Sequence, residues 1–67
     1  MGEQQKLSTL LGYWINHSRE HEDEFRDWAR RISAMNGEAS SLLLKAADAL
    51  ADATAWLVKA QDAIPKP

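Results

Sequence analysis

The sequence contains no cysteine, so neither a disulfide nor a zinc site built from thiolates can stabilise the chain. Its 67 residues are enough for a single domain, residues 1–67, and a domain of this size buries little surface when it folds. Small chains without disulfides usually depend on a metal, on oligomerisation or on unusually close helix packing. We therefore expect one of these three to stabilise the protein.

The chain also lacks an excess of positive charge and a long apolar run. Its 10 acidic residues outnumber its 8 lysines and arginines, and the formal net charge is -2. Such a chain has no overall basic field to attract nucleic acid or anionic lipid. No apolar run approaches the roughly 20 residues of a membrane span, and the N-terminus lacks the layout of a signal peptide. We expect neither nucleic acid nor a membrane as a partner, and a cytoplasmic location.

The residues that usually carry catalysis are absent or isolated. There is no cysteine nucleophile, and no glycine-rich loop that would hold a phosphate group. Ser18 lies between His17 and His21 in the sequence, but helical spacing alone supplies neither an oxyanion hole nor an orienting acid. We expect no enzymatic activity.

What the sequence does contain is an apolar pattern with a period of about 3.5 residues, which is typical of helices packed along a seam. The first series consists of Leu7, Leu11, Trp14, Ser18, His21, Phe25, Trp28, Ile32 and Met35. The second series consists of Leu43, Ala46, Leu50, Ala53, Leu57, Ala60 and Ile64. The pattern predicts an all-α fold with one helix over about residues 3–35 and another over about residues 38–64.

A turn at residues 36–37 joins the two predicted helices. Gly37 can adopt the left-handed conformation that ends a helix, and Pro65 ends the second helix because proline lacks an amide hydrogen. Folding the chain at this turn gives an antiparallel hairpin in which Trp14 faces Ala60 and Trp28 faces Ala46. Large residues opposite alanines fill a helix interface without voids. The predicted seam core consists of Leu11, Trp14, Phe25, Trp28, Ile32, Leu43, Leu50 and Leu57.

A three-helix bundle is the alternative fold, with a break in the first helix near residues 16–18. Asn16 and Ser18 are good helix-capping residues, and Gly12 weakens the helix nearby. A break would normally reset the apolar period, whereas this period continues through the segment. The pattern therefore favours the unbroken hairpin.

The second predicted helix has more apolar residues than one seam requires. A further stripe, flanked by Leu10 on the first helix, consists of Leu42, Ala49, Trp56 and Ala63. A helix that is apolar over most of its circumference is usually surrounded by protein. We therefore expect a homodimer in which two hairpins form a four-helix bundle. The alternative is that a different protein covers this stripe.

Both histidines lie in one short acidic segment of the first helix. His17 and His21 are one helical turn apart, and Glu24 continues the same line. Two imidazoles and a carboxylate at this spacing form a partial ligand set for zinc or nickel. The other interpretation is that His21 packs in the seam and fixes the register of the helices. The spacing leaves both interpretations open.

The segment from about Leu10 to Ala29 resembles a group of short uncharacterised prokaryotic helical proteins. The shared pattern is Trp-Ile-x-His-x-x-x-His-x-x-Glu-Phe-x-x-Trp-Ala, which this chain carries from Trp14 through His17, His21 and Phe25 to Ala29. The resemblance implies that the two-histidine segment is a feature of the family. It implies no function, and it does not distinguish a ligand from a packing residue.

Overall fold

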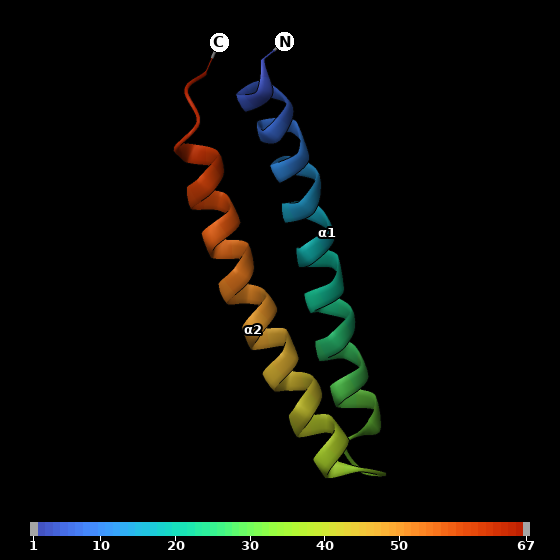
Figure 1. The fold of residues 1–67 in the computed structure, drawn as a ribbon. Helices are drawn as coiled ribbons and strands as arrows, with labels where there is room; N and C mark the ends of the chain where they lie inside the picture. The colour runs from blue at the N-terminus through green and yellow to red at the C-terminus, as the bar shows by residue number, and fades with distance from the viewer. Residues whose placement is uncertain (1, 67) are drawn as a thin grey trace.

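Two long helices form an antiparallel hairpin in the computed structural model, which describes residues 2–66 (Figure 1). Helix α1 spans Glu3–Ile32, helix α2 spans Gly37–Asp62, and the hairpin measures 51 × 14 × 12 Å. The two termini lie together at the end opposite the loop (Figure 1). The predicted all-α hairpin is confirmed. The alternative three-helix bundle is wrong, because α1 continues without a break through residues 16–18.

The loop differs in detail from the predicted turn at residues 36–37. α1 ends at Ile32, three residues before the predicted end, and the chain continues in a tight turn closed by a 2.8 Å hydrogen bond from Asn36 N–H to the Ile32 carbonyl. Gly37 is not left-handed, since no residue among 2–66 has a positive φ. It is instead the first residue of α2, and the Asn36 side chain caps that helix by accepting a 2.9 Å hydrogen bond from Ala39 N–H.

Near the loop, the seam between the helices is built from small residues. Ala29 and Ala47 are fully or almost fully buried, at 1% and 0% exposure. Beside them, the buried Ser40 hydroxyl donates a 2.8 Å hydrogen bond to the Ala29 carbonyl on the other helix. A serine side chain can reach a backbone carbonyl of another helix only where the two backbones lie close together. The seam is therefore a site of close approach.

The predicted seam was displaced by one residue on both helices. Trp14 and Trp28, which were expected to lie in the seam core, are 42% and 55% exposed, and His21 is exposed as well. The seam positions belong instead to the residues that follow the predicted set, namely Ser8, Ile15, Glu22 and Ala29 on α1 with Ala47, Thr54 and Gln61 on α2. Indole rings in the seam would hold the backbones apart, whereas alanine and serine allow them to approach.

The remaining predicted seam residues lie along one edge of the seam. Leu11 is buried at 3% exposure, and Ile15 beside it is also buried. The others are half-buried: Phe25, Ile32, Leu43, Leu50 and Leu57. No large side chain among the described residues is fully buried. The hairpin alone therefore leaves part of its apolar surface in contact with water.

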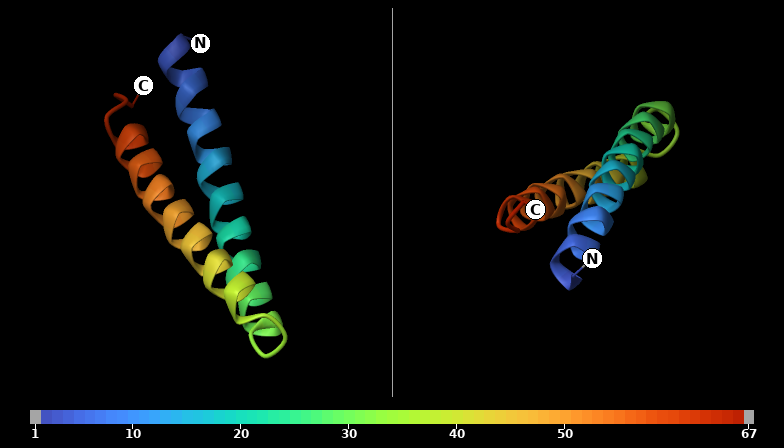
Figure 2. Two further views of the ribbon diagram at one scale, coloured as in Figure 1. Left: turned by 60° about the horizontal axis from the view of Figure 1, so that its bottom comes forward. Right: turned by 90° about the horizontal axis from the view of Figure 1, so that it is seen from above.

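The helices are close together near the loop and farther apart near the termini, as the two views in Figure 2 show. Near the loop, the short side chain of Ser40 is long enough to reach Ala29. Near the termini, the longer side chain of Gln61 makes the corresponding contact, and its amide donates a 3.1 Å hydrogen bond to the Ser8 carbonyl. On α2, the longer side chain thus occurs where the helices are farther apart.

Candidate association face

Most of the exposed large apolar residues gather on one side of the hairpin, whereas Tyr13, Met35 and Leu44 lie elsewhere. On α1 the residues that gather on this side include Leu7, Trp14 and Trp28. These residues are separated by multiples of seven and therefore form one stripe along the helix. On α2 the corresponding stripe consists of the exposed alanines Ala46, Ala53 and Ala60. Both stripes flank the same edge of the seam, the edge where the half-buried leucines and Phe25 lie. In an antiparallel helix pair, equivalent flanks lie on the same side of the hairpin.

We call this side the association face. It consists of Leu7, Leu10, Trp14, His21 and Trp28 on α1 with Leu42, Ala46, Ala53, Trp56 and Ala60 on α2. The stripes of both helices nearest the seam edge contain no lysine, arginine, aspartate or glutamate, whereas Glu24 and Arg31 follow Leu10 at multiples of seven residues and border the face. Contiguous apolar surface without charge is typical of a protein interface.

The residues expected to form an interface from the sequence are all exposed. Leu10 is 46% exposed, Leu42 is 56% exposed and Trp56 is 67% exposed, whereas Ala49 and Ala63 are exposed members of the same stripe as Trp56. The Lys59 ammonium lies 4.7 Å from the centre of the Trp56 ring, and Arg31 lies 4.9 Å from the Trp28 ring. These cation–π contacts place charge at the rim of the association face and leave its centre apolar.

The opposite side of the hairpin is charged. Arg26 on α1 donates hydrogen bonds to Glu22, at 3.0 Å, and across the seam to Asp48 on α2, at 3.1 Å. These two bonds raise the pKa of the Arg26 guanidinium above its ordinary value. Glu22 occupies a seam position, and its pairing with Arg26 meets the need of a half-buried carboxylate for a partner. The Arg26–Asp48 pair lies on the side of the hairpin that faces away from the association face.

The two histidines belong to a row of aromatic rings along α1. Tyr13 and His17 have ring centres 4.4 Å apart, His17 and His21 are 5.9 Å apart, and His21 and Phe25 are 6.3 Å apart. The His21 Nδ1 atom lies 3.5 Å from a carboxylate oxygen of Glu24. Within residues 2–66, however, no three histidine, aspartate or glutamate side chains are gathered closely enough to hold a metal ion. Of the predicted ligands, only His21 and Glu24 are brought into contact.

His21 is exposed and does not lie in the seam between the helices. The interpretation that it fixes the register of the hairpin from within the seam is therefore wrong. Ser40 and Gln61 instead donate hydrogen bonds across the seam to backbone carbonyls of α1, and the apolar pattern did not indicate either residue. A signal for them exists, since Ser40, Ala47, Thr54 and Gln61 form a seven-residue series of small and polar residues.

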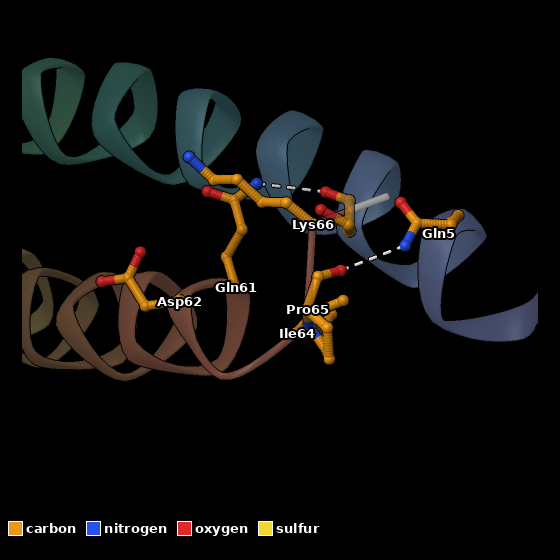
Figure 3. A pocket seen from close by; sticks show the side chains of 7 residues that line it. Gln5, Gln61, Asp62, Ile64, Pro65 and Lys66 are labelled. Carbon is orange, nitrogen blue, oxygen red and sulfur yellow. Dashed lines mark hydrogen bonds between the residues drawn. The ribbon is translucent and has the colours of Figure 1, made fainter.

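A polar pocket of about 430 Å³ lies between the separated ends of the helices (Figure 3). Two glutamine side chains form hydrogen bonds between the helices at this end. Gln5 donates a 3.1 Å hydrogen bond to the Pro65 carbonyl, and Gln61 donates one to the Ser8 carbonyl. The pocket is lined by Gln5, Ser8, Gln61, Asp62, Ile64, Pro65 and Lys66. Among the described residues that line it there is no histidine or cysteine, so none of them supplies an imidazole base to the Ser8 hydroxyl.

Residues 7–64 match the domain of unknown function DUF8180. The chain belongs to this family. An uncharacterised protein of Archaeoglobus fulgidus is similar, with 32% identity over 60 residues that cover 90% of this chain and 97% of that protein. No solved structure matches the chain. The DUF8180 match and this relative agree with the expected membership in a group of small uncharacterised proteins, whereas the specific two-histidine pattern stays a prediction.

Neither α1 nor α2 is long and apolar enough to cross a membrane within the described part of the chain.

Proposed function

We propose that this DUF8180 protein is a non-enzymatic association module, in which two hairpins pair through their association faces to form a four-helix bundle. The observation that carries the proposal is the uncovered apolar side of the hairpin, where Trp14, Trp28 and Trp56 are all more than 40% exposed. Tryptophan is the residue type most enriched among those that dominate the energy of protein interfaces.

The surface area of the hairpin supports a second copy as the occupant. The chain exposes 5098 Å², whereas a compact monomer of 7.5 kDa exposes roughly 4,250 Å² by the usual scaling of area with mass. The excess is roughly 850 Å², close to the approximately 800 Å² per partner of a standard protein interface. One association face paired with another is thus about the right size to cover it.

The half-buried edge of the seam supports the same arrangement. In a four-helix bundle each helix packs against two neighbours, and the residues between its two contact stripes point to the bundle centre. On α1 the residues between the seam and the tryptophan stripe are Leu11, Ser18, Phe25 and Ile32. On α2 the equivalent residues are Leu43, Leu50, Leu57 and Ile64. Pairing of two association faces would complete the burial of these side chains.

A charge placed on the association face tests the proposal. Ala53→Glu introduces a carboxylate on this face, and Ala55→Glu introduces the same carboxylate on another side of α2; both alanines are exposed in the hairpin. Because an unpaired buried charge costs several kcal/mol, we expect Ala53→Glu to weaken dimerisation by roughly 100-fold or more. Ala55→Glu should leave dimerisation unchanged.

Sedimentation equilibrium measures this difference, with circular dichroism as the check that each variant is helical. The unmodified chain and Ala55→Glu should give twice the mass of the 7.5 kDa chain, and Ala53→Glu should give the single mass. A monomeric mass for the unmodified chain at high concentration would contradict the proposal. In that case a different protein would be the occupant of the association face.

A second proposal is that His17, His21 and Glu24 bind a divalent metal such as zinc or nickel. The observation that favours it is the 3.5 Å contact of His21 with Glu24 on an exposed turn, with His17 one turn before. Imidazole nitrogens and a carboxylate oxygen suit these metals. Binding would require His17 to adopt another rotamer, because the three side chains are not gathered in the described structure.

Zinc titration of protein without a histidine tag tests the metal proposal. If it holds, isothermal calorimetry should give a defined stoichiometry, and His17→Gln should weaken binding by roughly 10-fold or more, because the loss of even an outer-shell partner typically weakens metal binding by about 10–100-fold. Asn16→Gln, on the neighbouring exposed position, is the control. The same weak, non-stoichiometric heat from all three proteins would rule the site out.

A further inference from the structure

The two flanks of the association face differ sharply in size. In the stripes nearest the seam edge, the α1 flank has Leu7, Trp14, His21 and Trp28, whereas the α2 flank has Ala46, Ala53 and Ala60; Leu42 and Trp56 belong to a separate stripe of α2 that lies farther from the seam. All of these residues are exposed in the hairpin. One flank of this surface therefore has large side chains and the other has small ones. Two copies are complementary only when the large side chains of one copy pack against the small side chains of the other.

Two face-to-face orientations are compatible with two-fold symmetry. If the axis runs parallel to the helices, α1 packs on α2 of the second copy, and both loops lie at the same end of the bundle. If the axis runs across the helices, α1 packs on α1 and α2 packs on α2, and the loops lie at opposite ends. The orientations differ in which flanks meet.

We infer that the hairpins pair with their loops at the same end, a conclusion that rests on the proposed dimer. In this orientation the tryptophans of each α1 meet the alanines of α2 in the second copy, on both sides of the bundle. The opposite-end orientation sets tryptophan and histidine against tryptophan and histidine on one side, and alanine against alanine on the other. Such a bundle would be a wedge, with a gap along one pair of helices, and close-packed interfaces avoid gaps of this kind.

The heights of the residues along the bundle agree with this orientation. Arg26 contacts Asp48 within the hairpin, so Trp28, two residues after Arg26, lies near the height of Ala46, two residues before Asp48. Rotation about an axis parallel to the helices preserves height. Trp28 therefore meets Ala46 of the second copy at the same height.

The other end of the hairpin gives a similar match. Gln61 hydrogen-bonds to the Ser8 carbonyl, and its side-chain amide would lie 3.3 Å from a Cβ atom added at Gly12. Trp14 therefore lies within about one helical turn of Ala60. Trp28 and Trp14 thus each have an alanine near their own height in the second copy.

Distances between spin labels test the orientation. The chain has no cysteine, so Ala34→Cys in the loop gives a single label site per chain. Thr9→Cys near the termini and Asn16→Cys near the middle of α1 give two more; all three positions are exposed. Pulsed dipolar spectroscopy of each labelled dimer then reports the distance between equivalent positions.

In the same-end orientation all three distances should be short, roughly 25 Å or less before the label linkers are added, because the bundle is only two helix diameters wide. In the opposite-end orientation the loop labels would be separated by about the 51 Å length of the hairpin, and only the label at position 16 would give a short distance. Long distances at positions 34 and 9 would overturn this inference and leave the dimer standing. Absence of a dipolar signal at all three positions would overturn the dimer itself.

Discussion

The seam and the association face of this hairpin use opposite kinds of residue. The seam buries alanine and serine, with Ala47 at 0% exposure, whereas the association face leaves Trp56 at 67% exposure. In a unit of two helices, burial is decided by how closely the backbones approach. Near the loop, Ala29 and Ala47 permit that approach and are buried by it, whereas Leu11 and Ile15 are buried nearer the termini. The three tryptophans are excluded from the seam and remain available for another contact.

This division has a consequence for stability. Burial of alanines removes little apolar area from water and therefore contributes little hydrophobic free energy. The main effect of the alanines in the seam is to let the two helices lie close together. The larger apolar area lies on the association face and becomes buried only when a partner covers it. We therefore expect folding and association to be linked, so that the thermal midpoint rises with protein concentration.

Enlarging a seam residue should have the largest effect on the free energy of unfolding. Ala47→Leu forces a large side chain between the helices, and overpacking of a tight site costs about 1–3 kcal/mol or more in unfolding free energy. Ala55→Leu makes the same change at an exposed position outside the association face and should have little effect. Urea denaturation at one protein concentration measures both variants. Equal midpoints would mean that the helices are not in close contact at Ala47.

Removing the hydroxyl that crosses the seam should have a smaller effect. Ser40→Ala deletes the hydrogen bond to the Ala29 carbonyl, and Ser41→Ala makes the same change at the exposed neighbouring position. Both variants gain helix propensity, so their difference isolates the contact across the seam. We expect Ser40→Ala to be less stable than Ser41→Ala by about 1 kcal/mol. If the two thermal midpoints coincide, the contact contributes nothing to stability.

Much of the fold could be predicted from the period of the apolar residues. That period continues through residues 16–18, and α1 does the same. The turn was predicted at residues 36–37, whereas the loop between the helices is residues 33–36, and its chemistry also differs from the prediction. A glycine next to an asparagine allows either residue to make the turn, and here Asn36 acts as the cap of α2 while Gly37 begins the helix.

The candidate site could be predicted less completely. The exposed stripe of Leu42 and Trp56 was anticipated, because the helix has more apolar residues than one seam can use. The exposure of Trp14 and Trp28 was not anticipated, because large apolar residues are ordinarily expected in the core. Whether His17, His21 and Glu24 gather depends on rotamers, which the spacing along a helix does not specify.

The sequence by itself determined two helices, their approximate lengths and the place where the chain reverses, because these follow from local propensity and from a period that only a helix satisfies. It did not determine which stripe of α1 faces α2. Two adjacent stripes, one with Trp14 and Trp28 and one with Ile15 and Ala29, have the same seven-residue period, so periodicity cannot choose between them. The tertiary structure made that choice, because only the stripe with the smaller residues lets the two backbones come close enough for Ser40 to reach the Ala29 carbonyl.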